Sequence, residues 1–341
     1  MHKVNPDRVP AFTLSSGAKL PVVGMGTFGN DRFTPDQVAS AVKGAALAGY
    51  RLFDCAAAYQ NEPEIGAALE AAMAEGGIPR EDLFICSKVW NDMHSRGDVL
   101  IACARTLKDL RLDYLDGYMV HWPFPNYHPP GCARDYRNPD SHPFLVDEFM
   151  VTWRQMERLV DLGLVRHIGV SNMTEAKLRA VLPLCRIRPE FNEVELHPAF
   201  QQPRLFDYCK AEGIQLIGFC PLGSPTRPAR DKLPEDVSVM EMPEVVEIAR
   251  RHGVHPALIC VKWAVRRGHI PIPFSIYESE YVSNLRCVTE DPLSDEEFET
   301  LTRIDTGRRI IKAQNFLWPG AEGWWNLWDE KGEIDLTGWN G

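Results

Sequence analysis

The chain reads YRLFD at residues 50–54, DLFICSK at 82–88 and YLDGYMVH at 114–121, three hydrophobic runs that each end in a polar residue. A short apolar run bounded by polar residues is typical of a strand buried in a parallel sheet. The carboxyl ends of such strands carry the chemistry, because the connecting loops there build the site. We therefore expect the polar residues at these three ends to lie close together.

The same pattern recurs along most of the chain and alternates with amphipathic segments. Eight strands are predicted, at residues 22–26, 51–54, 83–88, 115–121, 165–170, 190–195, 215–219 and 270–273. Helices are predicted at residues 35–48, 62–74, 99–110, 146–162, 175–182, 203–211 and 243–265, with a further one after Ser294. This alternation is what an α/β fold of the (β/α)8 TIM-barrel type requires. We expect one domain over residues 1–341, with a β-hairpin at 10–22, a long loop at 122–145 and a C-terminal tail at 305–341.

Four polar residues at the predicted strand ends suit proton transfer. Asp54, Lys88 and His121 end three successive strands, and Tyr59 follows Asp54 closely. The pKa of tyrosine is ordinarily about 10, and a nearby Lys88 ammonium held by Asp54 is expected to lower it. His121 can donate a hydrogen bond to a carbonyl oxygen and place it beside the Tyr59 hydroxyl. Each residue alone is usually a solvated side chain. Together they predict protonation of a carbonyl oxygen while a cofactor delivers hydride, which no side chain can donate.

Composition and charge argue against several classes of protein. Of the 341 residues, 45% are hydrophobic and 25% are charged, as in ordinary globular proteins. The net charge of -10 argues against a nucleic-acid partner, which needs a basic face. No apolar run reaches the ~18 residues of a membrane span, and the opening MHKVNPDRVP lacks the apolar region of a signal peptide. The nine cysteines form no C-x-x-C pair. We expect a reduced, cytoplasmic protein without a metal site or a membrane partner, by default a monomer.

Residues 24–29, GMGTFG, match the G-x-G-x-x-G fingerprint of a dinucleotide-binding Rossmann fold. In that motif the glycines lead directly into a helix whose N-terminus meets the pyrophosphate. Here the helix begins only at Thr34-Pro35, and Asp54 comes ~10 residues later than the usual ~20-residue separation of the acid. We therefore reject the Rossmann alternative.

Several stretches resemble the aldo-keto reductase superfamily over nearly the whole chain. They are GMGTF (24–28), DCAAAYQNE (54–62), SKVWN (87–91), YLDGYMVHWP (114–123), LVRHIGVSN (164–172), ELHPAFQQ (195–202) and CPLGS (220–224). Their shared order and spacing make the resemblance specific. It implies a (β/α)8 barrel that binds a nicotinamide cofactor extended across the strand ends, without a Rossmann domain.

The resemblance implies a role for each residue of the site. Its catalytic residues are Tyr59 as proton donor, Lys88 and Asp54 as the pair that tunes it, and His121 as the residue that orients the substrate. Ser171 and Asn172 match the pair that holds the nicotinamide amide, and Phe219 stands where the family usually has a tyrosine stacked on the ring. Further cofactor contacts are expected at Gly26, Thr27, Phe28, Leu222, Ser224, Phe274, Ser275, Glu280 and Asn284.

Two departures from the family pattern bear on the cofactor. Glu193 stands where the family commonly has glutamine, so it can accept from the nicotinamide amide but, when ionised, cannot donate to its oxygen. Its charge favours the oxidised cofactor. NADP-preferring members place basic residues where this chain has Phe274 and Glu280. Because phosphate recognition relies on Arg or Lys, while an acid suits the ribose of NAD, we predict a preference for NAD(H) over NADP(H). The alternative is neutral change with NADPH as cofactor, its charge met by Arg227 or Arg286.

Aromatic residues are expected to form the substrate pocket, with Phe28, Trp90 and Trp122 as one wall. The 122–145 loop and the tryptophan-rich tail are expected to complete it at the barrel mouth, the alternative being that the tail covers the barrel's side. The tail tryptophans are Trp318, Trp324, Trp325, Trp328 and Trp339. Polar loop residues favour a sugar or related alcohol over a flat ketone, unless they face solvent. They are Asn126, Arg134, Asp135, Arg137 and Asp140.

Three functions remain open from the sequence. The first is a nicotinamide-dependent carbonyl reductase or alcohol dehydrogenase, acting on a small aldehyde, ketone or aldose. The second is a regulatory subunit that keeps the fold and the cofactor while turnover is incidental. The third is a metal-dependent barrel hydrolase, against which stands the lack of a His-x-His or comparable ligand pair at a strand end.

Overall fold

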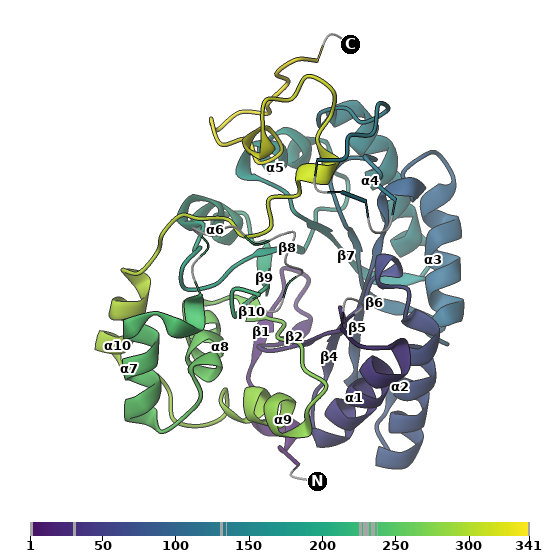
Figure 1. Cartoon of the computed structure of the whole chain (residues 1–341). Helices are drawn as coiled ribbons and strands as arrows, with labels where there is room; N and C mark the ends of the chain where they lie inside the picture. The colour runs from purple at the N-terminus through teal and green to yellow at the C-terminus, as the bar shows by residue number, and fades with distance from the viewer. Residues whose placement is uncertain are drawn as a thin grey trace.

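Eight parallel strands follow one another in chain order around the centre of the molecule (Figure 1). The computed structural model describes residues 3–29, 32–129, 132–133, 135–224, 227, 232, 236 and 238–339. The strands are β3 (Met25–Gly26), β4 (Leu52–Asp54), β5 (Phe84–Val89), β6 (Leu115–Val120), β7 (Val165–Ser171), β8 (Phe191–Glu195), β9 (Gln215–Phe219) and β10 (Ile270–Pro271). Hydrogen bonds from Gly24 N to Pro271 O (3.1 Å) and from Gly26 N to Pro273 O (3.2 Å) join the first strand to the last. The predicted (β/α)8 barrel is confirmed.

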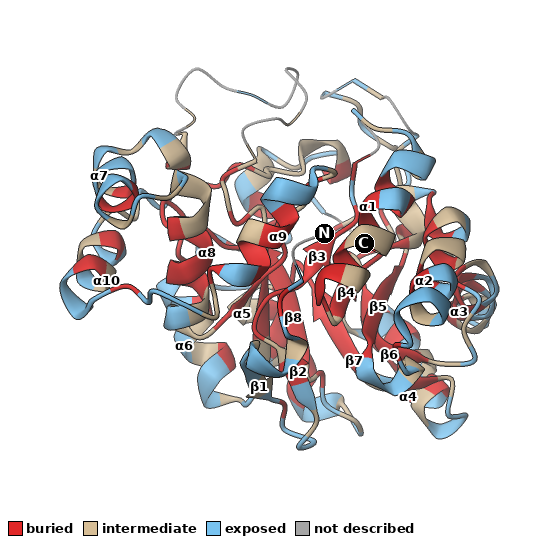
Figure 2. Ribbon diagram, turned by 90° about the horizontal axis from the view of Figure 1, so that it is seen from below, coloured by how far each residue is buried: buried red, intermediate tan, exposed pale blue. Residues whose placement is uncertain are grey.

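Helices surround the sheet, with their inner faces buried and their outer faces exposed (Figure 2). They are α1 (Pro35–Ala48), α2 (Glu62–Gly76), α3 (Asp98–Asp109), α4 (Val146–Asp161), α5 (Glu175–Val181), α6 (Pro203–Ala211), α7 (Pro243–His252), α8 (Pro256–Arg267), α9 (Glu278–Arg286) and α10 (Asp295–Thr302). The predicted start of α1 is correct, since the Thr34 hydroxyl accepts from Gln37 N and the Gln37 side chain accepts from Thr34 N. No helix in the described part of the chain is both long and apolar enough to cross a membrane.

One helix prediction is wrong, and one helix was not predicted. The single helix expected at residues 243–265 is two helices, because Gly253 adopts a left-handed conformation (φ 64°) and ends α7 before Pro256 starts α8. Helix α9 was not expected from the sequence at all. It is nine residues long, and its N-cap Tyr277 makes no side-chain capping hydrogen bond, so the usual start signal is missing.

The N-terminal hairpin, β1 (Ala11–Thr13) with β2 (Lys19–Pro21), covers the amino-terminal end of the barrel. Leu14 and Leu20 pack into the same apolar cluster as Phe84 of the barrel interior. Ser16 Oγ in the turn donates to Glu190 Oε2, just before β8, at 2.5 Å. Because the hairpin plugs this end, the carboxyl ends of the strands are the open end of the barrel.

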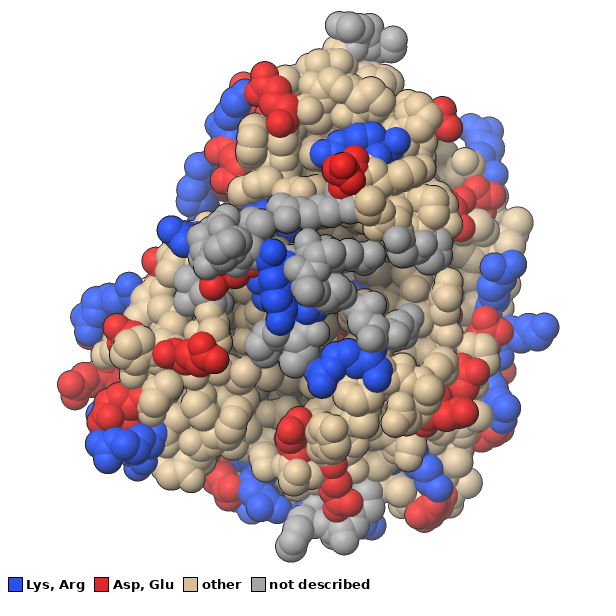
Figure 3. All heavy atoms as spheres, in the orientation of Figure 1, with Lys and Arg blue, Asp and Glu red and all other residues tan. Residues whose placement is uncertain are grey.

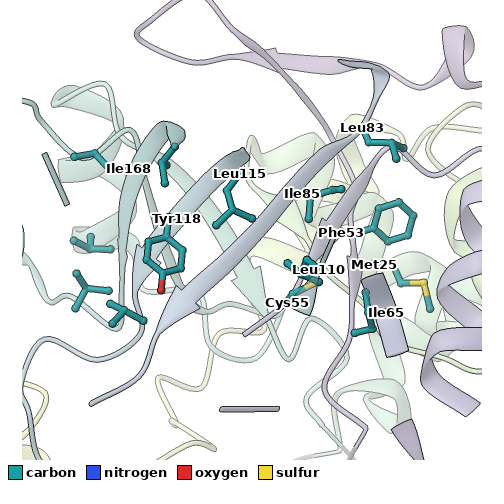
Figure 4. Close-up of a cluster of buried hydrophobic side chains, with 14 of the residues drawn as sticks. Met25, Phe53, Cys55, Ile65, Leu83, Ile85, Leu110, Leu115, Tyr118 and Ile168 are labelled. Atoms are coloured by element: carbon teal, nitrogen blue, oxygen red, sulfur yellow. The ribbon is translucent and has the colours of Figure 1, made fainter. Parts of the chain in front are cut away.

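Strand residues alternate between the barrel interior and the layer beneath the helices, as the period of two requires. In β5, Phe84 lies in the interior cluster, whereas Ile85 belongs to the outer layer shown in Figure 4. The same alternation puts Lys88 in the interior. At Gly169 a Cβ atom would lie 2.1 Å from the ring of Phe191, so the absent side chain lets that ring fill the barrel floor. The polar site therefore stands on a closely packed apolar floor.

Between α7 and α10 one histidine, His252, bonds two acids, and we expect this arrangement to make the stability of this side of the barrel depend on pH. His252 lies 2.6 Å from Asp291 and 3.0 Å from Glu297. Burial acts to lower the pKa of His252, but the bonds to Asp291 and Glu297 outweigh it and raise the pKa. The bonds from His252 and Lys262 lower the pKa of Asp291. Burial acts to raise the pKa of Glu297, but the bonds from the Ser294 backbone N–H and from His252 outweigh it and lower the pKa. The arrangement therefore stabilises the fold most when both acids are ionised and the imidazole is protonated.

We expect His252→Gln to lower the free energy of unfolding by on the order of 1 kcal/mol at pH 5 to 6. The loss should fade as pH rises through the folded pKa of His252, because the neutral imidazole contributes little. Urea denaturation over a pH series measures this. His255→Asn, which replaces an exposed imidazole by another N-capping side chain, is the control and should show no such pH dependence. An equal loss at acidic and alkaline pH would contradict the assignment.

Candidate active site

The four side chains predicted to act together meet at the carboxyl end of the barrel. Lys88 Nζ lies 2.6 and 2.7 Å from the two carboxylate oxygens of Asp54 and donates to the Cys55 carbonyl at 3.2 Å. The Tyr59 hydroxyl lies 3.4 Å from the same ammonium. The ring of His121 stands edge-on to that of Tyr59, with centroids 5.8 Å apart.

The strand register explains how these residues come together. β4 pairs with β5 so that Asp54 lies beside Cys86, and Lys88 follows two residues later on the same face. Tyr59 lies in a short 3-10 helix, Ala57–Tyr59, directly after β4. His121 follows β6, and its backbone N–H donates to the carbonyl of Val89 at the end of β5 (3.1 Å).

Lys88 is completely buried, so its charge depends on its partners. Burial acts to lower the pKa of Lys88, but the negative charges of Asp54 and Glu193 outweigh it and raise the pKa well above its ordinary value. Glu193 Oε1 lies 3.3 Å from Lys88 Nζ, a contact additional to the predicted pair. The ammonium is therefore shared by two acids.

Tyr59 departs from the expectation that its pKa falls. Burial, the largest influence, raises the pKa of Tyr59, and Asp54 and Glu193 also raise it, while Lys88 lowers it. The influence of Lys88 has the predicted sign, but burial and the two acids outweigh it, and the phenol stays protonated. Burial and the nearby Lys88 charge hold the pKa of His121 well below its ordinary value, so its imidazole is neutral.

A cavity of about 1580 Å³ opens above these residues and extends from the strand ends to α9 and the C-terminal tail. On the face drawn in Figure 3, acidic and basic side chains are interspersed rather than gathered by sign. Tyr59, Asp54 and His121 line the cavity, as do Phe28, Trp90 and Trp122 of the expected aromatic wall. All the residues proposed for the cofactor line it too, namely Gly26, Thr27, Phe28, Ser171, Asn172, Glu193, Phe219, Leu222, Ser224, Phe274, Ser275, Glu280 and Asn284.

Two residues of the cavity wall carry buried acceptor atoms that fit a carboxamide. Asn172 Oδ1 and Glu193 Oε2 have no hydrogen-bond partner within the described ranges. The amide nitrogen of Asn172 already donates to the His121 carbonyl (2.9 Å), which fixes the Asn172 side chain. A primary carboxamide, such as that of nicotinamide, has two N–H donors that could satisfy such acceptors. The wall therefore suits a nicotinamide ring next to Tyr59.

Comparison with known proteins identifies the family. The profile of the Aldo/keto reductase family matches residues 22–306. The chain belongs to the aldo/keto reductase family. The chain is 39% identical to an aldo/keto reductase of Synechocystis (94% of this chain, 96% of that protein). It is 38% identical to the human aldo-keto reductase family 1 member A1 (87% and 90%).

Solved aldo-keto reductases share the fold. A Bombyx mori aldo-keto reductase in complex with NADP is 30% identical, with a TM-score of 0.77 over 90% of this chain and 95% of that chain. The aldose reductase of Schistosoma japonicum is 33% identical, with a TM-score of 0.78 over 92% and 97%. As an aldo/keto reductase, the chain is an oxidoreductase of a family that reduces small-molecule carbonyl compounds with NAD(P)H.

The tail of this aldo/keto reductase contributes to the site differently from the prediction. Ile310 to Phe316 line the cavity, whereas the tryptophans behind them do not. Trp318 and Trp328 are buried, and the Trp328 ring packs on Trp122 with centroids 5.8 Å apart. The tail therefore reaches the barrel mouth, but its tryptophans do not line the cavity. Trp328 supports Trp122 from behind, whereas Trp325 and Trp339 are exposed.

The polar loop residues do not form the pocket either. Asn126 is buried and holds the loop to the tail, donating to the carbonyls of His142 and Phe316 at 2.8 Å each. Asp135, Arg137 and Asp140 are exposed and do not line the cavity. Arg134 lies outside the described residues. The described loop residues therefore give no support to the sequence-based argument for a sugar substrate.

Glu195 is a structural residue of the site that the sequence analysis did not identify. Its carboxylate accepts from the backbone N–H groups of Ile310 and Ile311, both at 2.8 Å, and from His197 at 3.0 Å. It is fully buried, and bonding to His197 outweighs burial and lowers its pKa. The sequence did contain a signal for it, because Glu195 lies two residues after Glu193 in β8 and therefore on the same face of the strand.

We expect Glu195→Gln to loosen the tail, because the amide nitrogen would face a backbone N–H and leave it unpaired, at a cost of roughly 1–3 kcal/mol. Denaturation together with limited proteolysis beyond residue 305 measures the effect. Glu157→Gln is the matched control, since buried Glu157 accepts from the N–H groups of Arg186 and Ile187 far from the tail. At Glu157 both N–H groups donate to the single oxygen Oε1, so a Gln amide oxygen can keep both bonds. The loss of stability and the cleavage of the tail should therefore appear in Glu195→Gln alone.

Proposed function

We propose that the protein interconverts a carbonyl compound and the corresponding alcohol, with Tyr59 as proton donor and acceptor. The observation that carries this proposal is the contact of the Tyr59 hydroxyl with the buried Lys88 ammonium inside a large cavity. A bound nicotinamide cofactor supplies or accepts the hydride. The unpaired acceptors of Asn172 and Glu193 support its placement against the wall formed by β7 and β8.

The residues of the chain then divide the proton chemistry between them. The neutral His121 imidazole donates a hydrogen bond to the substrate oxygen and holds it beside Tyr59. Tyr59 is protonated at rest and gives its proton to that oxygen as hydride reaches the carbon. The phenolate left behind is stabilised by Lys88, whose charge Asp54 maintains. The reverse sequence oxidises an alcohol.

The pocket around this group favours a flat, hydrophobic carbonyl compound. Trp90 contacts the ring of His121 (5.0 Å between centroids), and Phe28 contacts that of Tyr59 (5.2 Å). Phe316 from the tail packs on Trp122 at 4.6 Å. Aromatic faces of this kind bind aromatic and alkyl surfaces. We therefore propose aromatic aldehydes and ketones as substrates ahead of aldoses.

The cavity end near α9 supports a preference for NAD(H). Ser275 Oγ donates to Glu280 Oε2 at 2.6 Å. The hydroxyl hydrogen of Ser275 is therefore already bonded to the carboxylate and is not free to bond a phosphate on the ribose. No Lys or Arg lies among the described residues that line the cavity from Phe274 to Asn284. The 2′-phosphate of NADP would lie beside the Glu280 carboxylate there, which is unfavourable. The Bombyx mori relative, in contrast, was solved in complex with NADP. Free ribose hydroxyls can instead donate to Glu280.

We expect Tyr59→Phe to lower kcat by roughly 10²- to 10⁴-fold while the affinity for cofactor is kept, because the proton donor is lost and the cavity is not. Turnover should be measured with a panel of aromatic aldehydes, ketones, aldoses and polyols, with both cofactors and in both directions. Unchanged turnover in Tyr59→Phe would instead favour a cofactor-binding regulatory subunit. Faster reduction of aldoses than of aromatic aldehydes would overturn the substrate proposal.

We expect a higher kcat/KM with NADH than with NADPH. Glu280→Lys should shift the ratio towards NADPH by about tenfold or more, because an ammonium replaces a carboxylate beside Ser275. Glu278→Lys makes the same charge change on the same helix but does not border the cavity, so the ratio should stay as in the wild type. A wild-type enzyme that favours NADPH would show the cofactor proposal to be wrong.

A further inference from the structure

Glu193 is a buried acid at the point where the cavity meets the Lys88 ammonium. It lies in the middle of β8, and the residue is 2% exposed. One carboxyl oxygen, Oε1, lies 3.3 Å from Lys88 Nζ, while Asp54 holds the same ammonium at 2.6 and 2.7 Å. The other oxygen, Oε2, is buried and unpaired within the described part of the chain, and Glu193 is one of the residues that line the cavity. Two acids therefore compete for one ammonium, and Glu193 is the more distant of them.

The charges around Glu193 leave one acid in excess. Burial and the negative charge of Asp54 raise the pKa of Glu193 well above its ordinary value, and Lys88 acts in the opposite direction. The titratable groups that face it are Asp54 on β4, Lys88 and Cys86 on β5, Tyr59 after β4, and Cys220 after β9. Burial raises the pKa of Tyr59, of Cys86 and of Cys220, the last to about 12, so these groups stay neutral. Glu193 is then the group whose proton can come and go.

A nicotinamide ring in this cavity would distinguish the two forms of Glu193. To deliver hydride to the carbon whose oxygen Tyr59 protonates, the ring must lie near Tyr59, against the wall of Asn172 and Glu193. The ring is cationic when oxidised and neutral when reduced. A carboxylate stabilises the cation by Coulomb attraction in a site of low dielectric constant. A protonated carboxyl carries no charge and can donate a hydrogen bond to the carboxamide oxygen.

We propose that Glu193 sets the redox preference of the bound cofactor by gaining or losing a proton, the ionised form favouring oxidised and the protonated form favouring reduced nicotinamide. This inference rests on the proposed function, in which a nicotinamide cofactor occupies the cavity. By linkage, NAD⁺ promotes the loss of the Glu193 proton to solvent, and its affinity rises with pH. NADH leaves the Glu193 proton in place, so the affinity for NADH does not rise with pH.

The dissociation constants of NAD⁺ and NADH, measured by tryptophan fluorescence from mildly acidic to mildly alkaline pH, test the proposal. In the wild type, the ratio of the NADH constant to the NAD⁺ constant should rise with pH by on the order of tenfold. In Glu193→Gln, which keeps the shape without the titration, the ratio should be independent of pH. Glu193→Asp should retain the dependence. Calorimetry in buffers of different ionisation enthalpy should find proton release on NAD⁺ binding in the wild type, which tests the proposal without any variant.

Glu62→Gln is the matched control. Glu62 is also buried, its pKa is raised chiefly by burial, and it accepts from Ser87 and Thr106, but it does not line the cavity. In Glu62→Gln, the ratio of the two dissociation constants should depend on pH as it does in the wild type. A ratio that is independent of pH in the wild type, or equally dependent in Glu193→Gln, overturns the inference and leaves the proposed function intact. Failure of both nucleotides, and of their phosphorylated forms, to bind at any pH refutes the proposed function and the inference together.

Discussion

The pairing of a buried ammonium with buried carboxylates is the interaction on which the rest of the site depends. Taking Lys88 out of water costs several kcal/mol unless its charge is compensated. The register of β4 against β5 brings Asp54 within hydrogen-bond distance, and β8 adds Glu193 from across the barrel. Because the strands fix these acids, the ammonium has a fixed position, and the Tyr59 hydroxyl and the cavity are arranged around it. The strands of the barrel thus fix the position of the Lys88 charge.

Much of this arrangement was predictable because it depends on the strand pattern. A hydrophobic run that ends in Asp54 or Lys88 predicts both a buried strand and a polar group at its carboxyl end. The strand period of two then decides which residues face inward, so Lys88 shares the interior with Phe84. The resemblance to aldo-keto reductases supplied the cofactor residues, and each of them lies in the cavity wall.

What could not be predicted depends on contacts between distant segments without a periodic pattern. The loop residue Asn126 reads as an exposed amide, but it is buried because it bonds to the tail carbonyl of Phe316, 190 residues later. The sign of the shift in the pKa of Tyr59 follows from the depth of burial against one ammonium and two acids, which a sequence does not give. The break at Gly253 was visible as a glycine, but the helical period continues through it, and the two helices therefore read as one.

The tail has a consequence for how the protein is made. Residues 310–316 form one wall of the cavity, and they are held by Glu195 and, further on, by the buried pair of Lys177 and Asp329 at 2.5 Å. All of these tail residues are synthesised after every strand of the barrel. During synthesis, all strands of the barrel therefore leave the ribosome before the residues that form this wall of the cavity. One wall of the cavity is therefore formed by residues that follow every barrel strand along the chain.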